Sequence, residues 1–195
     1  MTMQAHLTEY VDQLRDAIDA LPRDRLEAMG AMLFRAYSNG KQVFTVGNGG
    51  SASTASHMAA DLGKNTIGPN MPRFRILSLN DNAAIVTALA NDIGYEHIFS
   101  EQLINLIRPG DLLVAVSGSG NSPNVLNAMR YAREQCAEVI GILGFDGGRA
   151  VEFCDLAVIV PVAHYGVVED LHLIINHILV EYFKVRLAEE RSCLV

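Results

Sequence analysis

The sequence predicts an α/β protein with a doubly wound, five-stranded parallel sheet. Short apolar runs of four to six residues alternate with helical segments from residue 41 onward. Such runs are typical of strands that are buried on both faces of a parallel sheet. Two of the runs lead directly into the Ser/Gly-rich segments GNGGS and SGSGNS. In this architecture ligands bind beyond the carboxyl ends of the strands, so both segments are candidates for one binding crevice.

Residues 1–40 are predicted to form two helices ahead of the sheet. In the first helix, the apolar residues at helical spacing are Leu7, Val11, Leu14, Ile18 and Leu21. Pro22 ends this helix. The apolar residues of the second helix are Leu26, Met29, Met32 and Leu33. We expect a helical hairpin that either caps the domain or pairs with another subunit.

Residues 41–195 are predicted to form the α/β core. The expected strands are Val43–Val46, Phe74–Leu79, Asp111–Val116, Val139–Leu143 and Leu156–Val160. The expected helices are Ser51–Leu62, Asn82–Ala90, Ile98–Ile107, Asn121–Gln135 and a long C-terminal helix over residues 167–189. Pro123 falls near the start of its helix, where proline is tolerated. With no internal repeat visible, the whole chain, residues 1–195, is predicted to be a single domain.

The composition excludes several classes of protein. A formal net charge of -7 and a pI of about 5.3 argue against a protein that coats nucleic acid. Three scattered cysteines do not make a disulfide framework. The polar N-terminus lacks the apolar core of a signal peptide, and no apolar run could span a bilayer. We therefore expect a cytoplasmic protein with no nucleic-acid or membrane partner, and small anionic metabolites remain possible ligands.

The first candidate loop is GNGGSASTASH, residues 47–57. Its glycines let the backbone turn tightly, and a helix that begins near Ser51 would point its free N–H groups at a ligand. The segment is neither a P-loop, because the lysine is missing, nor a GxGxxG motif, because Ala52 replaces a glycine. Taken alone, it fits a plain tight turn as well as it fits a binding loop.

The second candidate loop is SGSGNS, residues 117–122. Three hydroxyls, two glycines and a helix N-terminus can hold a phosphate dianion without any cationic side chain. A flexible polar loop is the alternative, but such a loop would not need to follow a buried strand directly. The two loops together are a more specific signal than either one alone.

Several side chains could act as metal ligands or as acid–base groups. His57 and Asp61 are four residues apart and would share one face of a helix. In the last helix, Glu169 and His177 lie about two turns apart and roughly on one side. Imidazole and carboxylate groups suit zinc or another divalent metal. We expect His172, by contrast, to be an isolated polar residue on the surface of that helix.

The whole chain resembles the SIS (sugar isomerase) domain family, which has a flavodoxin-like fold, and within it the phosphoheptose isomerases. The matching motifs, in order, are GNGGSAS, ANDIGYEHIFS, SGSGNS, a DGG turn and a final ED-x-H-x4-H helix. The resemblance implies an aldose–ketose isomerase that interconverts D-sedoheptulose 7-phosphate and D-glycero-D-manno-heptose 7-phosphate for heptose or lipopolysaccharide precursors. It also implies a homotetramer in which residues of a neighbouring subunit complete each site.

The resemblance also implies roles for individual residues. Those expected to contact the substrate are Asn48, Gly49, Gly50, Ser51, Asp61, Asn91, Asp92, Gly118 and Glu169. The phosphate would be held by Ser117, Ser119 and Ser122. A divalent metal, often zinc in the family, would be bound by His57, Asp61, Glu169 and His177. Asp61 would move the proton in the aldose–ketose step, and His177 would be its partner acid or base.

Three positions depart from the usual family pattern. Asp61 stands where glutamate is usual, Glu169 where glutamine is usual, and Gly118 where threonine is usual. The shorter carboxylate at Asp61 moves the proton acceptor by more than about 1 Å. The departures suggest a divergent branch that prefers a different phosphosugar.

Two alternative functions remain open. Some relatives are non-catalytic phosphosugar-binding proteins, including a replication-initiator-associating factor that lacks the metal-site carboxylate and the final histidine. Because Asp61 and His177 are both present here, the enzyme is favoured. Other relatives sense phosphosugars within regulators, but these carry a DNA-binding domain for which this chain leaves no room.

Overall fold

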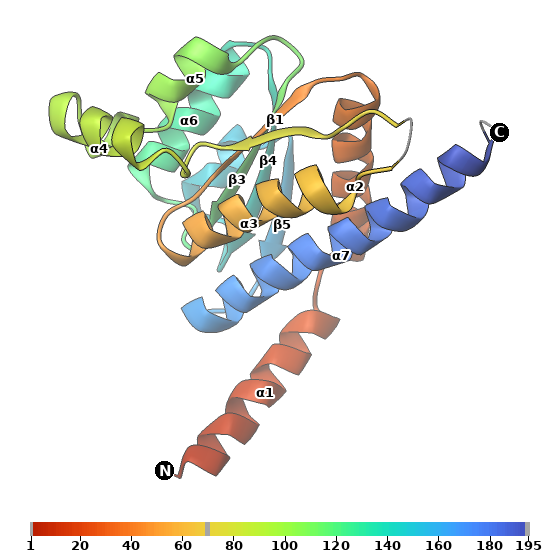
Figure 1. Ribbon diagram of the computed structural model, residues 1–195. Helices are drawn as coiled ribbons and strands as arrows, with labels where there is room; N and C mark the ends of the chain where they lie inside the picture. The colour runs from red at the N-terminus through yellow and green to blue at the C-terminus, as the bar shows by residue number, and fades with distance from the viewer. Residues whose placement is uncertain (1, 69–70, 194–195) are drawn as a thin grey trace.

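The computed structural model describes residues 2–68 and 71–193 and confirms the predicted α/β class. Five parallel strands form one sheet in the order β2-β1-β3-β4-β5 (Figure 1). Their bounds are β1 (Gln42–Val46), β2 (Arg75–Ser78), β3 (Leu112–Ser117), β4 (Glu138–Gly144) and β5 (Leu156–Val160). The strand order reverses between β1 and β3, the point at which ligands bind in doubly wound sheets. The first loop, residues 47–51, follows β1, and the second loop, residues 117–122, follows β3.

Helices cover both faces of the sheet. The helices on one face are α2 (Arg23–Ser38), α3 (Gly50–Asn65) and α7 (Tyr165–Cys193). Those on the other face are α4 (Ala83–Asp92), α5 (Ser100–Leu106) and α6 (Pro123–Glu134), with the short 3-10 helices η1 (Tyr95–His97) and η2 (Gly148–Phe153). Successive side chains of β3 alternate between the two apolar cores, so that Val114 joins one and Leu113 the other. Every residue of β3 is buried, as its continuous apolar run predicts.

The two N-terminal helices exist, but they do not form the expected hairpin. α1 (Met3–Asp19) extends away from α2 and lies against α7 (Figure 1). The Tyr10 hydroxyl donates a 2.6 Å hydrogen bond to Asp170 Oδ2 of α7, and this bond raises the pKa of Tyr10 to about 12. The apolar residues on the other side of α1, Leu7, Val11 and Ile18, are exposed. The helical spacing of α1 was therefore predicted correctly, but its partner was not.

Within the described part of the chain, no helix is both long enough and apolar enough to cross a bilayer.

Backbone packing fixes the shape of the second loop. Gly120 has φ +62°, and a Cβ atom there would run into the carbonyl oxygen of Gly147. Gly40 also has φ +62°, but a Cβ atom there would meet no atom within 4 Å. Both glycines therefore have a left-handed backbone that other residues rarely adopt, but only at Gly120 would a side chain also collide with neighbouring atoms.

We expect Gly120→Ala to lower the free energy of unfolding by about 3 kcal/mol, and Gly40→Ala by about 1 kcal/mol. The Gly40 variant reports the left-handed backbone alone, so the difference measures the contact between the loop and Gly147. Urea unfolding of both variants measures these values. Equal losses in the two variants would show that the loop moves away from Gly147 at little cost.

Candidate functional site

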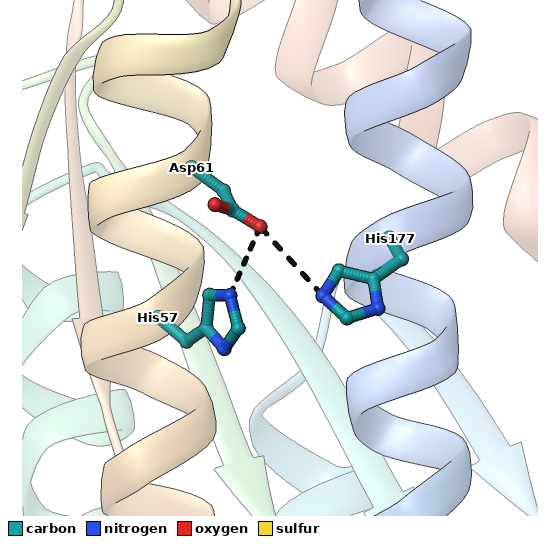
Figure 2. Close-up of side chains that lie close together, drawn as sticks. All are labelled: His57, Asp61 and His177. Atoms are coloured by element: carbon teal, nitrogen blue, oxygen red, sulfur yellow. Dashed lines mark ion pairs between the residues drawn. The ribbon is translucent and has the colours of Figure 1, made fainter.

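α3 and α7 lie side by side and bring three titratable side chains together (Figure 2). Asp61 Oδ2 lies 3.3 Å from His57 Nε2, one turn earlier on α3, and 3.8 Å from His177 Nε2 on α7. The two imidazole rings meet edge to face with their centroids 5.1 Å apart. The predicted i, i+4 pairing of His57 with Asp61 is thus present, and α7 supplies the third group.

The geometry of these three residues suits a divalent cation. One ligand atom from each of His57, Asp61 and His177 lies within 4.8 Å of the other two. Two imidazole nitrogens and one carboxylate oxygen are ligands that zinc accepts, and three protein ligands leave a coordination position open, as in catalytic zinc sites. A pocket of about 220 Å³ opens beside the group and is also lined by Asn65, Val180, Glu181 and Lys184. The donor set therefore fits the implied metal, and a small ligand could reach it.

The Asp61 carboxylate is also held by two amides that the sequence analysis did not single out. Asn65 Nδ2 donates to Asp61 Oδ1 at 2.9 Å, and Asn176 Nδ2 donates to Asp61 Oδ2 at 3.2 Å. Asn176 is completely buried, like the apolar residues Ile175 and Leu179 near it in α7. Its position next to His177 was the one signal in the sequence that could have revealed it.

Glu169 is not brought into this group of three residues. Its carboxylate lies instead against Gly50 at the beginning of α3, where a Cβ atom on the glycine would collide with it. A carboxylate is favourable there, because the positive end of the helix dipole lies at the N-terminus of α3. Glu169 therefore occupies the N-terminus of α3.

The expectation that His172 lies on the surface is wrong. His172 is 0% exposed; its ring lies near the backbone of Leu143, but neither ring nitrogen makes a hydrogen bond of good geometry. Burial lowers the pKa of His172 to about 4, because the charged imidazolium would lose its hydration. The spacing along α7 explains the error: His172 is in phase with Val168 and Ile175, which are buried.

The first and second loops meet at the predicted crevice. Asn48 of the first loop exchanges two 2.8 Å hydrogen bonds with Asn124, which lies just beyond the second loop. Tyr95 of η1 donates a 3.0 Å hydrogen bond to Asn48 Oδ1. Ser51 is buried at the start of α3, while Gly49 and Gly50 are exposed. Tyr95 and Asn124 were not predicted, because only the fold brings them to Asn48.

Two serine hydroxyls of the second loop accept hydrogen bonds from the backbone of the same loop. Ser117 Oγ accepts from Gly120 N at 3.1 Å, and Ser119 Oγ accepts from Asn121 N at 3.3 Å. Ser122 precedes α6 as its N-cap residue, but its side chain makes no capping bond. Pro123 has no N–H group, and Val125 N donates to Asn124 Oδ1 at 3.0 Å, so the N-terminus of α6 has few free N–H groups. Ser119 also lines a pocket of about 490 Å³ with Phe145 and Tyr165.

At Gly118, where the family usually has threonine, a larger side chain would meet Tyr165 of α7. A Cβ atom on Gly118 would lie 3.0 Å from Tyr165 Cε1, closer than ordinary van der Waals contact. Tyr165 packs edge to face on Phe145, with ring centroids 4.8 Å apart. A threonine at position 118 would therefore need Tyr165 to move.

Asn91 and Asp92 lie apart from the group of three residues. Both are exposed at the end of α4, and Asn91 Nδ2 donates to Asp92 Oδ1 at 2.7 Å. They precede η1, whose Tyr95 reaches Asn48. Their side chains face solvent near the crevice.

The fold, with its two Ser/Gly-rich loops at the sheet switch point, defines a protein of the SIS domain class, and a family model described as the SIS domain matches residues 6–144. The chain is 42% identical over 153 residues to a phosphoheptose isomerase from Rhodospirillum rubrum, covering 78% of this chain and 80% of the relative. A phosphoheptose isomerase from Chlorobaculum parvum is 38% identical over 176 residues, covering 88% and 83%. The chain belongs to the phosphoheptose isomerase family of SIS domain proteins.

Solved structures agree with this assignment. The phosphoheptose isomerase of Neisseria gonorrhoeae superposes with a TM-score of 0.84 at 29% identity, covering 93% of this chain and 96% of that chain. The phosphoheptose isomerase of Francisella tularensis superposes with a TM-score of 0.87 at 26% identity, covering 94% and 99%. The sheet, the flanking helices and the long C-terminal helix are thus shared with these proteins.

Proposed function

We propose that this chain is a sugar-phosphate isomerase that interconverts D-sedoheptulose 7-phosphate and D-glycero-D-manno-heptose 7-phosphate. The observation that carries the proposal is a carboxylate flanked by two imidazoles beside a pocket, in a chain of the phosphoheptose isomerase family. Aldose–ketose isomerisation needs a base for the proton on the carbon beside the carbonyl. It also needs a group that moves a proton between the two oxygens.

Asp61 and His177 are proposed as the catalytic residues. Asp61 Oδ2 accepts the proton from the carbon beside the carbonyl and returns it to the neighbouring carbon. His177 exchanges a proton between the hydroxyl and carbonyl oxygens through the ring nitrogen that would not hold the ion, which balances the reaction without any external oxidant or reductant. His177 is half-exposed, as a group that must reach substrate should be.

We propose zinc or another divalent ion as the cofactor, held by His57, Asp61 and His177. Such an ion, when bound, would polarise the substrate oxygens and stabilise negative charge that develops on them. Glu169 remains a proposed ligand only if its side chain turns away from Gly50, where its carboxylate now lies.

The second loop is the proposed phosphate site. Its serine hydroxyls offer donors beside the positive end of the α6 dipole, whereas the Glu169 carboxylate already lies against Gly50 at the N-terminus of α3. The remaining proposed substrate contacts are Asn48, Gly49, Gly50, Ser51, Asn91, Asp92 and Gly118. Binding energy from the phosphate orients the reacting end of the sugar.

A homotetramer with shared sites is proposed for the whole chain, residues 1–195 acting as one SIS domain. The second loop and the His57–Asp61–His177 group line different pockets, and Asp61 lies about 16 Å along α3 from Gly50. Apolar side chains are exposed on α1 and also on α7, at Ile178, Tyr182 and Val185. Both facts favour a partner subunit, and a monomeric mass in light scattering would oppose it.

A cytoplasmic location and a role in lipopolysaccharide precursor synthesis complete the proposal. Cys136 and Cys154 are free thiols, which suits a reducing compartment. Restoration of lipopolysaccharide heptose in a strain that lacks its own isomerase checks the pathway.

Turnover of sedoheptulose 7-phosphate by metal-replete protein tests the activity. We expect formation of the aldose phosphate, loss of the activity on chelation and its return when zinc is added. The His57→Ala variant should need more zinc for half-maximal activity, by about tenfold or more, because one ligand is lost. Phosphosugar binding without turnover in the loaded protein would instead favour the non-catalytic binding protein.

A further inference from the structure

Each of the two amides that contact Asp61 donates to a different oxygen of its carboxylate. Asn65, one turn later on α3, donates to Oδ1, and Asn176 of α7 donates to Oδ2. Rotation of the carboxylate about its Cβ–Cγ bond would break both hydrogen bonds. Oδ2, which lies near His57 and His177, is therefore held in one direction.

Asn176 is a polar side chain at a completely buried position. Its Oδ1 atom has no hydrogen-bond partner, so the amide is only half satisfied. The neighbours of Asn176 in α7 include the buried residues Ile175 and Leu179, and an apolar side chain would suit that environment. The bond to Asp61 is the interaction that accounts for an amide here.

The chemistry of an amide suits a residue that orients a carboxylate. Asparagine is neutral and offers N–H donors, so it can hold a carboxylate without adding a positive charge to the site. An aspartate carboxylate also lies close to its own helix, within reach of an i+4 amide. The departure from glutamate at Asp61 and the presence of both amides can thus be explained together.

We propose that Asn65 and Asn176 are positioning residues that clamp the Asp61 carboxylate with Oδ2 facing His57 and His177. The clamp aligns Asp61 for the cation and for proton transfer, and both asparagines act through Asp61 rather than on the substrate or the ion. The part of this inference that concerns proton transfer rests on the proposed isomerase activity, whereas the part that concerns the cation does not.

The test measures Co²⁺ affinity by visible absorption of the bound ion, together with kcat and KM for sedoheptulose 7-phosphate. The variants are Asn65→Ala and Asn176→Leu, with Asn65→Gln to return an amide. Lys64→Ala, an exposed neighbour on α3, and Ile175→Leu, a buried neighbour on α7, are the matched controls.

We expect Asn65→Ala and Asn176→Leu each to weaken Co²⁺ binding by about tenfold, as loss of a residue that orients a metal ligand does. They should also lower kcat by about tenfold at unchanged KM. Asn65→Gln should recover part of both losses, and the two controls should match the wild-type protein.

Wild-type Co²⁺ affinity in Asn65→Ala and Asn176→Leu would overturn the clamp, as would equal losses in the controls or failure of the unmodified protein to bind Co²⁺. If Asn176→Leu does not fold, the Co²⁺ affinities of Asn65→Ala and Asn65→Gln still test the clamp, because Asn65 is only half-buried. A loss of Co²⁺ affinity in a protein with no turnover would support the clamp and contradict the isomerase proposal.

Discussion

Replacing Asp61 with asparagine should lower kcat for isomerisation of the phosphosugar by about 10²- to 10⁴-fold. The amide has nearly the shape of the carboxylate, but it cannot accept the proton from carbon. The second loop, which is the proposed phosphate site, is unchanged, so binding of the substrate should be largely retained. Steady-state kinetics on metal-saturated protein, with product detected directly, measures the effect.

The control for this experiment is Asp12→Asn, which removes an exposed carboxylate of α1 that pairs with Arg15. It makes the same chemical change far from His57 and His177, and its kcat should equal that of the wild-type protein. A value of kcat within about threefold of wild type in folded Asp61→Asn would exclude Asp61 as the base.

The second large effect concerns acid stability and depends on His172. Its pKa is about 4 in the folded chain, against about 6.5 for an unfolded histidine. Below pH 6.5 the unfolded chain therefore takes up a proton that the folded chain does not, and stability falls as the pH drops. The loss from this one group should be about 2 kcal/mol at pH 5 and about 3 kcal/mol at pH 4, with no effect above pH 7.5.

Urea unfolding of the wild-type protein and His172→Leu, at pH 7.5 and at pH 5, isolates this contribution. The variant should lose about 2 kcal/mol less than the wild-type protein over this range, because all other titrating groups are common to both. At pH 7.5 it should be at least as stable, since two buried nitrogens that lack well-formed hydrogen bonds are removed. Identical pH dependence in the two proteins would mean that His172 reaches solvent in the native state.

The class of fold and the two loops could be predicted because they depend on local patterns. A continuous apolar run such as 112–116 has few alternatives to a buried strand, and parallel strands place the segments that follow them at one edge. The pairing of His57 with Asp61 was predictable for a similar reason, because helical periodicity alone puts them on one face.

Features that depend on how helices pack could not be predicted in the same way. The apolar spacing of α1 reveals a helix but not whether it packs on α2 or α7, and the bond from Tyr10 to Asp170 spans most of the chain. The direction of Glu169 toward Gly50 and the reach of Asn176 to Asp61 depend on the crossing of α3 and α7. A pattern within either helix cannot specify that crossing.

Because the His57–Asp61–His177 group is divided between α3 and α7, its three residues are synthesised at different times. His57 and Asp61 are synthesised before strands β2 to β5, whereas His177 is synthesised after them. A nascent chain that has completed its sheet still lacks one of the three proposed ligands, so its affinity for the proposed ion would be low. Binding of that ion would then favour the docked position of α7 and stabilise the fold late in its assembly.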